Sequence, residues 1–190
     1  MRIASLCFAL LCSASALQGG VKEARYSDPT TRYAHGILGD AIEFGTLEIT
    51  TDAGKIISML LPETRVFEDV APRLYDLDFD GDNEVVVVET SIAKGARLSV
   101  YDESGLIAAT PYIGRTNRWL APLGAADLDG DGHVEIAYID RPHLAKTLRI
   151  WRFENGGLTH LSDQVGLTNH KIGEDFISGG IRSCNGAFEI

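Results

Sequence analysis

Short runs in which apolar and polar residues alternate recur at regular intervals along this chain of 190 residues. Three of these runs, Leu47–Ile49, Leu98–Val100 and Leu148–Ile150, lie about 50 residues apart, and each has the alternation that is typical of a β-strand. Each run is followed by a turn that contains glycine and then by a second short run. Three strand–turn–strand units at this period predict an all-β fold of β-propeller-type repeats, or a similar array, rather than a single sandwich.

Two nine-residue segments rich in carboxylates stand directly before strand-like runs. In each segment, acidic side chains occupy alternate positions, and a glycine at position 6 allows the chain to turn sharply. Hard oxygens at alternate positions are what a calcium ion with six to eight oxygen ligands requires. The sequence therefore predicts two calcium sites, in which the residue at position 7 contributes its backbone carbonyl. The predicted ligands are Asp76, Asp78, Asp80, Asp82 and Glu84 in the first loop and Asp127, Asp129, Asp131, His133 and Glu135 in the second.

Two other interpretations of these loops explain the pattern less well. Solvated Asp-Gly turns would explain one loop, but hardly two loops with matched acids at four positions. An EF-hand needs flanking helices and a bidentate glutamate at position 12. Position 12 is Val87 in the first loop and Tyr138 in the second, and both residues lie in runs typical of strands. The EF-hand interpretation therefore fails, and the loops are expected to lead into strands.

The two loops lie 51 residues apart, counted from Asp76 to Asp127. The segments Tyr75–Val85 and Ala126–Ile136, together with this spacing, resemble the FG-GAP/VCBS repeats of integrin-α-like β-propellers. The resemblance extends over about residues 33–190. It implies four-stranded blades that bind calcium in such loops, with the acids named above as ligands. It implies little about biological role, because such families include adhesion and carbohydrate-associated proteins.

Residues 33–190 divide into three predicted repeats, 33–83, 84–134 and 135–190. A closed propeller has at least about four blades, so three repeats predict an incomplete ring of about three four-stranded blades. An open ring leaves an unpaired strand edge, through which we expect the chain to self-associate.

A third copy of the loop can be aligned to Ile181–Glu189. Positions 5, 6 and 9 keep Asn, Gly and Glu, but positions 1 and 3 are Ile181 and Ser183. We expect the turn to be retained and the metal to be lost, because one carboxylate is too little charge for a hard dication.

The N-terminal residues have the pattern of a secretory signal peptide. Met1–Arg2 provide a positive start, Ile3–Leu11 an apolar run and Ala14–Ala16 a cleavage site of small residues. Residues 1–16 are therefore predicted to be removed, which makes the protein secreted or periplasmic. Residues 17–32 lack periodicity and are predicted to form a linker. No apolar run is long enough for a transmembrane segment.

The net negative charge of the chain comes mostly from the two loops. Without residues 1–16 the chain has 16 basic and 27 acidic residues, a net charge of −11, and nine of those acids belong to the two loops. The remaining 18 acids nearly balance the 16 bases, which argues against a nucleic-acid partner. Cys184 is the only cysteine left after cleavage, and we expect it to be buried as a small apolar residue.

The sequence carries no nucleophile elbow, phosphate loop, dinucleotide fingerprint or zinc-protease motif, and it assigns no catalytic residue and no organic cofactor. Two clusters join a histidine to carboxylates, as acid–base catalysis would require, but such residues are also ordinary in exposed loops. Trp119 and Trp151 are expected in the core. The clusters are His35, Asp40 and Glu43, and His170, Glu174 and Asp175.

The leading interpretation is a secreted calcium-binding β-propeller repeat protein that acts as a structural or interaction module. Adhesion or ligand binding would be its role, and its partner would be an unidentified protein or glycan. The alternative is an extracellular hydrolase or lyase that acts on polysaccharide, with the propeller as its scaffold.

Overall fold

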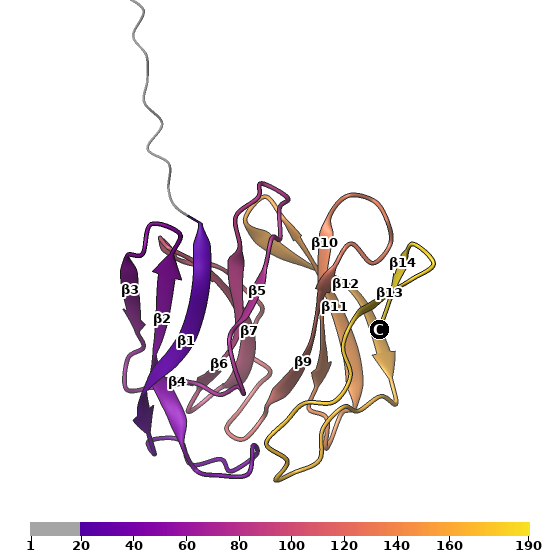
Figure 1. The fold of residues 1–190 in the computed structure, drawn as a ribbon. Coiled ribbons are helices and arrows are strands. Elements are labelled where there is room, and N and C mark those ends of the chain that lie inside the picture. Colours follow the sequence, from indigo (N-terminus) through magenta and orange to yellow (C-terminus); the bar gives the residue numbers. More distant parts are fainter. Residues whose placement is uncertain (1–19) are drawn as a thin grey trace, which may run out of the picture.

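A computed structural model describes residues 20–190, and every regular element in that range is a β-strand (Figure 1). The predicted signal peptide lies outside the described residues. No helix in residues 20–190 is long and apolar enough to cross a bilayer. The strands are Val21–Thr30 (β1), Glu43–Thr51 (β2), Ile56–Leu60 (β3), Arg65–Phe67 (β4), Arg73–Tyr75 (β5), Glu84–Ser91 (β6), Gly95–Asp102 (β7), Gly105–Ala109 (β8), Leu120–Ala126 (β9), Val134–Asp140 (β10), Thr147–Glu154 (β11), Gly157–Val165 (β12), Arg182–Cys184 (β13) and Ala187–Glu189 (β14).

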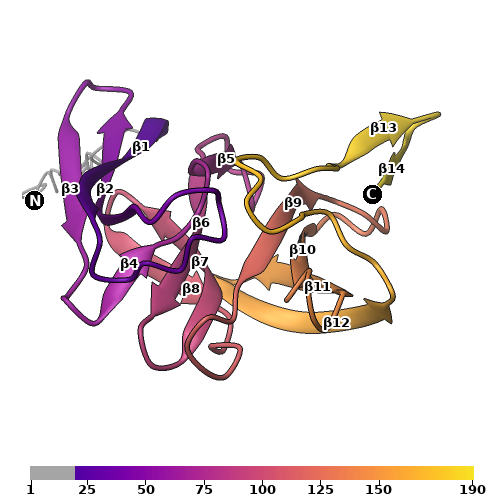
Figure 2. The ribbon, with the colours of Figure 1, turned by 90° about the horizontal axis from the view of Figure 1, so that it is seen from below.

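The strands pair in antiparallel fashion and form three sheets, none of which closes into a barrel (Figures 1 and 2). One sheet has the order β1-β2-β4-β6-β7-β8, with β3 paired to β2 and β5 paired to β6. A second sheet has the order β12-β11-β10-β9, and β13 and β14 form a separate hairpin. The prediction of an all-β chain of incomplete propeller-type repeats is therefore confirmed.

The boundaries of the predicted repeats do not coincide with the boundaries of the sheets. The predicted boundary between residues 83 and 84 falls between β5 and β6, and the one between residues 134 and 135 falls inside β10. The second sheet is a complete four-stranded unit, whereas β4 links the first two units into one sheet through the pair Phe44↔Phe67. The division into three repeats therefore stays a prediction from sequence spacing, and it does not mark where one sheet ends and the next begins.

The linker predicted for residues 17–32 is wrong for residues 21–30, which form β1. This strand pairs with β2 from Val21↔Thr51 to Thr30↔Glu43. Tyr26 on β1 stacks on Phe44 and Phe67, with ring centroids 5.6 and 5.4 Å apart. Only one face of β1 is buried, and the register shifts near its start, so the hydrophobic alternation in the sequence is too weak to reveal the strand.

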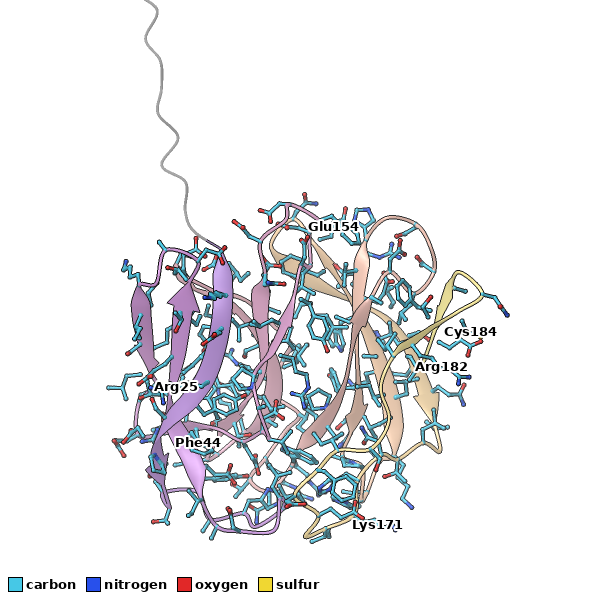
Figure 3. The ribbon with its side chains drawn as sticks, in the orientation of Figure 1. Arg25, Phe44, Glu154, Lys171, Arg182 and Cys184 are labelled. Atoms are coloured by element: carbon cyan, nitrogen blue, oxygen red, sulfur yellow. The ribbon has the colours of Figure 1, made fainter. Side chains whose placement is uncertain are left out.

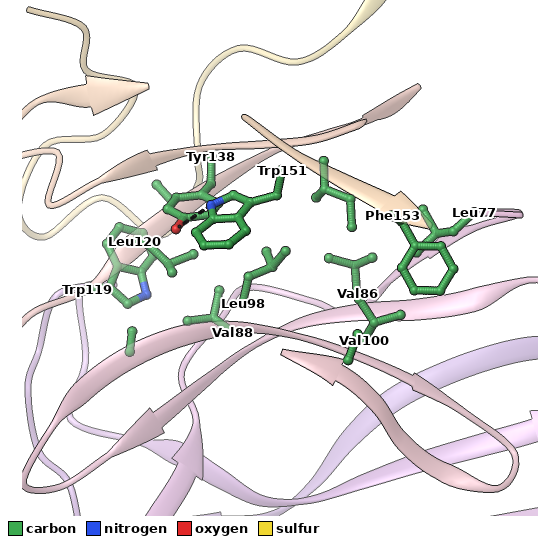
Figure 4. Close-up of a cluster of buried hydrophobic side chains, with 14 of the residues drawn as sticks. Leu77, Val86, Val88, Leu98, Val100, Trp119, Leu120, Tyr138, Trp151 and Phe153 are labelled. Carbon is green, nitrogen blue, oxygen red and sulfur yellow. Dashed lines mark hydrogen bonds between the residues drawn. The ribbon is translucent and has the colours of Figure 1, made fainter. Parts of the chain in front are cut away.

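Strand β6 is buried on both faces because it lies between two other units. Val86 and Val88 pack towards the second sheet, in a cluster that includes Trp119 and Trp151 (Figure 4). Val85 and Val87 pack in the opposite direction, against residues of β2 and β4. The predicted core positions of both tryptophans are confirmed, with exposed fractions of 2% and 8%. Figure 4 also shows the hydrogen bond that Trp151 Nε1 donates to the Tyr138 hydroxyl, at 3.1 Å.

The segment aligned to the third loop forms the β13–β14 hairpin (Figure 2). Asn185 and Gly186 make its two-residue turn with φ values of 51° and 84°, as a type I′ turn requires. The predicted turn is confirmed. Cys184 lies in this hairpin, has no disulfide partner among residues 20–190 and is only half-buried, so the prediction that it is buried is wrong (Figure 3).

Candidate metal loops and a histidine pocket

The two acidic loops lie at the same end of the sheets, at the top in Figure 1. One joins β5 to β6 and the other joins β9 to β10, so each connects the first strand of a unit to the second. The expectation that both lead into strands is confirmed. Gly81 and Gly132 stand at position 6 with φ of 96° and 89°, a conformation that favours glycine.

The two loops share one set of side-chain-to-backbone hydrogen bonds. The carboxylate at position 1 accepts from the amide at position 6, those at positions 3 and 5 accept from the amides two residues later, and the glutamate at position 9 accepts from the amide at position 2. These bonds wrap the backbone around the acids and hold their oxygens on one side. In the two loops the glutamate bonds are Leu77 N–Glu84 Oε2 at 2.8 Å and Leu128 N–Glu135 Oε2 at 2.9 Å.

Three of the five predicted ligands in each loop converge. Their oxygens lie within 4.8 Å of one another, a spacing that could hold a metal ion. The acids at position 5 and the residues at position 7 lie outside these groups, and the side chain of Asp82 lies against Gly20 instead. The converging sets are Asp76, Asp78 and Glu84, and Asp127, Asp129 and Glu135.

The acids of the first loop have no cationic partner among residues 20–190. Burial, and then the neighbouring Asp78, Asp80 and Asp76, raises the pKa of Glu84 to about 7. Burial, followed by Asp80, also raises the pKa of Asp78. The Oδ1 atom of Asp76 is buried and accepts no hydrogen bond from residues 20–190. An orphaned carboxylate oxygen beside two other acids fits a divalent cation, which would supply the missing partner.

The second loop already contains a positive charge. The Arg152 guanidinium, on β11, lies 2.8 Å from Asp129, Asp131 and Glu135 oxygens. Asp127 has no orphaned oxygen, because its Oδ1 accepts from the amides of Gly130 and Asp131 and its Oδ2 from Gly132. The two loops therefore have the same pattern of backbone hydrogen bonds, but only the second has an arginine among its acids.

A pocket of about 150 Å³ lies at the opposite end of the sheets, among the loops at the bottom of Figure 1. His35, Arg118 and His143 line it together with Asn117 and Trp119. These residues come from the β1–β2, β8–β9 and β10–β11 connections, which are far apart in sequence. Arg141 also lines the pocket, but its guanidinium is held by both oxygens of Asp140. Arg118 forms no ion pair with any residue in the described range.

His35 is oriented by Glu68, which the sequence analysis did not single out. Its Nδ1 donates a hydrogen bond to Glu68 Oε1 at 2.5 Å, and the Thr90 hydroxyl donates to Oε2 at 2.6 Å. The Glu68 side chain is fully buried, and burial raises its pKa, although the bond from His35 opposes that shift. With Nδ1 committed to Glu68, the Nε2 atom of His35 is left for a ligand or a proton.

His170, from the second predicted cluster, contacts another histidine. His170 Nε2 donates to the backbone carbonyl of Glu174 at 3.0 Å, so its Nδ1 must accept from His143 Nε2, 3.1 Å away. Burial, and then His170, lowers the pKa of His143. Figure 3 labels Lys171, which follows His170 at this lower end.

Neither predicted cluster forms as the sequence suggested. His35 contacts Glu68 rather than Asp40 or Glu43, and no hydrogen bond joins His170 to the carboxylate of Glu174 or to Asp175 among the described residues. Both histidines instead come to one end of the fold. Glu68 and Asp69, an acidic pair directly after a buried strand, were the signal that could have revealed part of this site.

Together these features define an all-β repeat protein with two acidic loops that could hold metal. Residues 76–138 match the family model of the FG-GAP-like repeat, and the match includes both loops and the strands between them. This segment is thus similar to an FG-GAP-like repeat, and repeats of this family commonly bind divalent cations. Comparisons with curated proteins and with solved structures gave no match.

Proposed function

We propose that this protein is a secreted or periplasmic calcium-binding module of the β-propeller type, which serves a structural or interaction role. The observation that carries the proposal is the orphaned Oδ1 of Asp76 beside Asp78 and Glu84, in a loop without a cationic partner in the described residues. Calcium is favoured among divalent ions because the loop offers carboxylate and carbonyl oxygens at alternate positions. FG-GAP-like repeats are typically extracellular, which agrees with the signal-peptide pattern of residues 1–16.

Bound calcium would neutralise the converging acids and fix the loops at one end of the sheets. Extracellular calcium modules have dissociation constants of about 10⁻⁴ to 10⁻³ M. Free calcium at tenfold that constant would add about 1.4 kcal/mol of stability per occupied site. Stiffened loops at one end would offer a preorganised surface to a protein or glycan partner.

Calorimetry of the protein without residues 1–16 tests the proposal, in EDTA and in millimolar calcium. We expect calcium to raise the melting temperature, and Asp76→Asn to remove most of that rise. Asp52→Asn is the matched control, since Asp52 is an exposed turn residue outside both loops. A melting temperature that does not respond to calcium would refute the proposal.

The histidine pocket favours a second candidate function, an extracellular hydrolase or lyase acting on polysaccharide. The specific observation is that buried Glu68 orients His35 in the same pocket as Arg118, which lacks an acidic partner in the described chain. His35 Nε2 would accept a proton, while the Arg118 guanidinium and the Asn117 amide would bind an acidic group on the sugar.

A panel of neutral and uronic-acid glycans tests this second function. We expect turnover of an acidic glycan that His35→Asn abolishes and His160→Asn leaves intact, because His160 lies on β12, outside the pocket. Absence of turnover across the panel, or equal activity of the two variants, would count against the enzyme.

A further inference from the structure

The position of Arg152 in the second sheet follows from strand register. Arg152 stands directly opposite Glu135 in the β10–β11 ladder. Its Nε donates to Glu135 Oε1, and its Nη2 lies 2.8 Å from both Asp129 Oδ2 and Asp131 Oδ2. One guanidinium thus meets the acids at positions 3, 5 and 9 of the loop. The backbone of Arg152 is fixed within β11, so the strand register places its positive charge beside the loop.

The equivalent strand position beside the first loop carries an acidic residue instead of an arginine. The β6–β7 ladder includes the pair Val85↔Tyr101, so one step further the register places Asp102 opposite Glu84. Asp102 directs its Oδ1 to the amides of Ser104 and Gly105 in its own turn. The two repeats therefore differ by an arginine in one and an aspartate in the other.

We propose that Arg152 is a built-in cation of the second loop, so that the two loops bind calcium unequally. This inference rests on the proposed calcium function and deepens it. The first loop is the high-affinity site, and the second binds an ion only when the guanidinium leaves. Arginine and calcium require the same oxygens, and two cations within one ring of carboxylates repel each other.

The hydrogen bonds of the second loop strengthen this argument. Both oxygens of Asp127 accept backbone amides, and Glu135 Oε2 accepts the amide of Leu128. One oxygen each of Asp129 and Asp131 also accepts a backbone amide, and the acidic oxygens that remain are those that Arg152 contacts. In the first loop, by contrast, Asp76 Oδ1 is buried and has no hydrogen-bond partner within the described part of the chain. The second loop is thus held in shape without metal, whereas the first depends on an ion for its charge balance.

Calcium titration followed by native mass spectrometry and calorimetry tests the inference. The wild-type protein should bind one ion first and a second only at a free calcium concentration about tenfold or more higher, as ligand charge sets the affinity of such sites. Arg152→Met keeps the aliphatic stem and should bring the second site to within about threefold of the first. Arg182→Met is the control, because Arg182 is exposed and its one ion pair in the described residues is with Glu189 of its own hairpin.

Melting in EDTA provides a readout that does not depend on bound ion. Arg152→Met should melt lower than wild type in EDTA, since three acids lose their counter-charge, and should gain more from calcium. If this variant does not fold, Arg152→Lys replaces it, with a smaller gain in second-site affinity expected because lysine lacks the planar fork.

The outcomes distinguish a failure of the Arg152 inference from a failure of calcium binding. Two equal sites in the wild type, or a second site unaffected by both Arg152 variants, overturns the inference and leaves calcium binding intact. Binding of no ion by wild type and variants alike refutes the proposed function, and the inference with it.

Discussion

Glu89 and Arg97 face each other across the β6–β7 ladder, with Arg97 Nη2 2.8 Å from Glu89 Oε2. The Glu89 carboxylate is fully buried, and within residues 20–190 it is surrounded by hydrogen-bond donors. Arg65 bonds its other oxygen at 2.6 Å, and the hydroxyls of Ser99, Tyr101 and Tyr112 also reach it. Burial alone would raise the pKa of Glu89, but the hydrogen bonds and charges of Arg97 and Arg65 outweigh it and lower that pKa.

Replacing Glu89 with glutamine should therefore destabilise the fold by about 3–5 kcal/mol at neutral pH, because two arginines lose a buried partner. A lowered carboxyl pKa contributes stability above the unfolded pKa and loses it as pH falls through the folded value. The difference between Glu89→Gln and wild type should thus shrink in acid. Urea denaturation at several pH values measures it.

Glu48→Gln is the control for Glu89, because Glu48 pairs with the exposed Arg25 (Figure 3). We expect that substitution to cost no more than about 1 kcal/mol. Equal costs for the two variants would show that the buried network contributes nothing specific.

The pKa of Glu43 is shifted in the opposite direction from that of Glu89. Glu43 is buried on β2, and burial first, then Glu68, Asp40 and Asp69, raises its pKa to about 9. A raised carboxyl pKa means that the native state holds a proton that the unfolded state has released above about pH 4.5. Stability should then fall as pH rises from about 4.5 to 9.

Glu43→Gln removes this dependence, since the amide resembles the protonated acid. We expect the variant to be more stable than wild type by about 1–3 kcal/mol at pH 8, and nearly equal to it at pH 4.5. Thermal melts across this range are the measurement. A constant difference at all pH values would contradict a titrating Glu43.

The acidic loops were predictable because their ligands are local: a nine-residue segment contains the turn glycine and all the acids. The histidine pocket was not, because His35, the Glu68 that orients it and His143 come from separate connections that only the tertiary fold brings together. Arg152 was hidden for a different reason. Its contact with the loop depends on the β10–β11 register, and neighbouring residues in sequence carry no sign of it.

Strand β1 shows the limit of hydrophobic patterning. Its apolar residues are few, and the burial of Tyr26 depends on Phe44 and Phe67 from other strands. Strand β6, in contrast, was evident as a run of four valines, because both of its faces are buried.

Phe79 occupies position 4 of the first loop with φ of 60°, where the second loop has Gly130 with φ of 78°. The phenyl ring is largely exposed, so it contributes little burial to offset the left-handed backbone. Phe79→Gly should stabilise the protein by up to about 1 kcal/mol. Phe79→Ala keeps the strain and should be nearly neutral. Thermal melting of both variants in EDTA would contradict the prediction if alanine stabilised as much as glycine.

The outer face of the β9–β12 sheet is apolar, and we expect the chain to self-associate through it. Ala137, Ile139 and Leu148 form a small apolar cluster on the side of this sheet away from the main core. A pocket of about 220 Å³ lies over it and is lined by Leu167 and Ile190, both more than 40% exposed. Strand β12 pairs only with β11 among the described strands, so an unpaired edge adjoins this apolar face.

An apolar face beside an unpaired strand edge favours contact with a second copy of the chain. We expect light scattering to show a concentration-dependent increase in mass. Leu167→Glu should reverse that increase, because a charge placed on the exposed rim of the pocket would lose its water on association. Leu106→Glu is the control, since Leu106 is similarly exposed but lies on β8 and does not line this pocket. A compact monomer at all concentrations would refute the prediction, and equal effects of the two glutamates would place the contact elsewhere on the molecule.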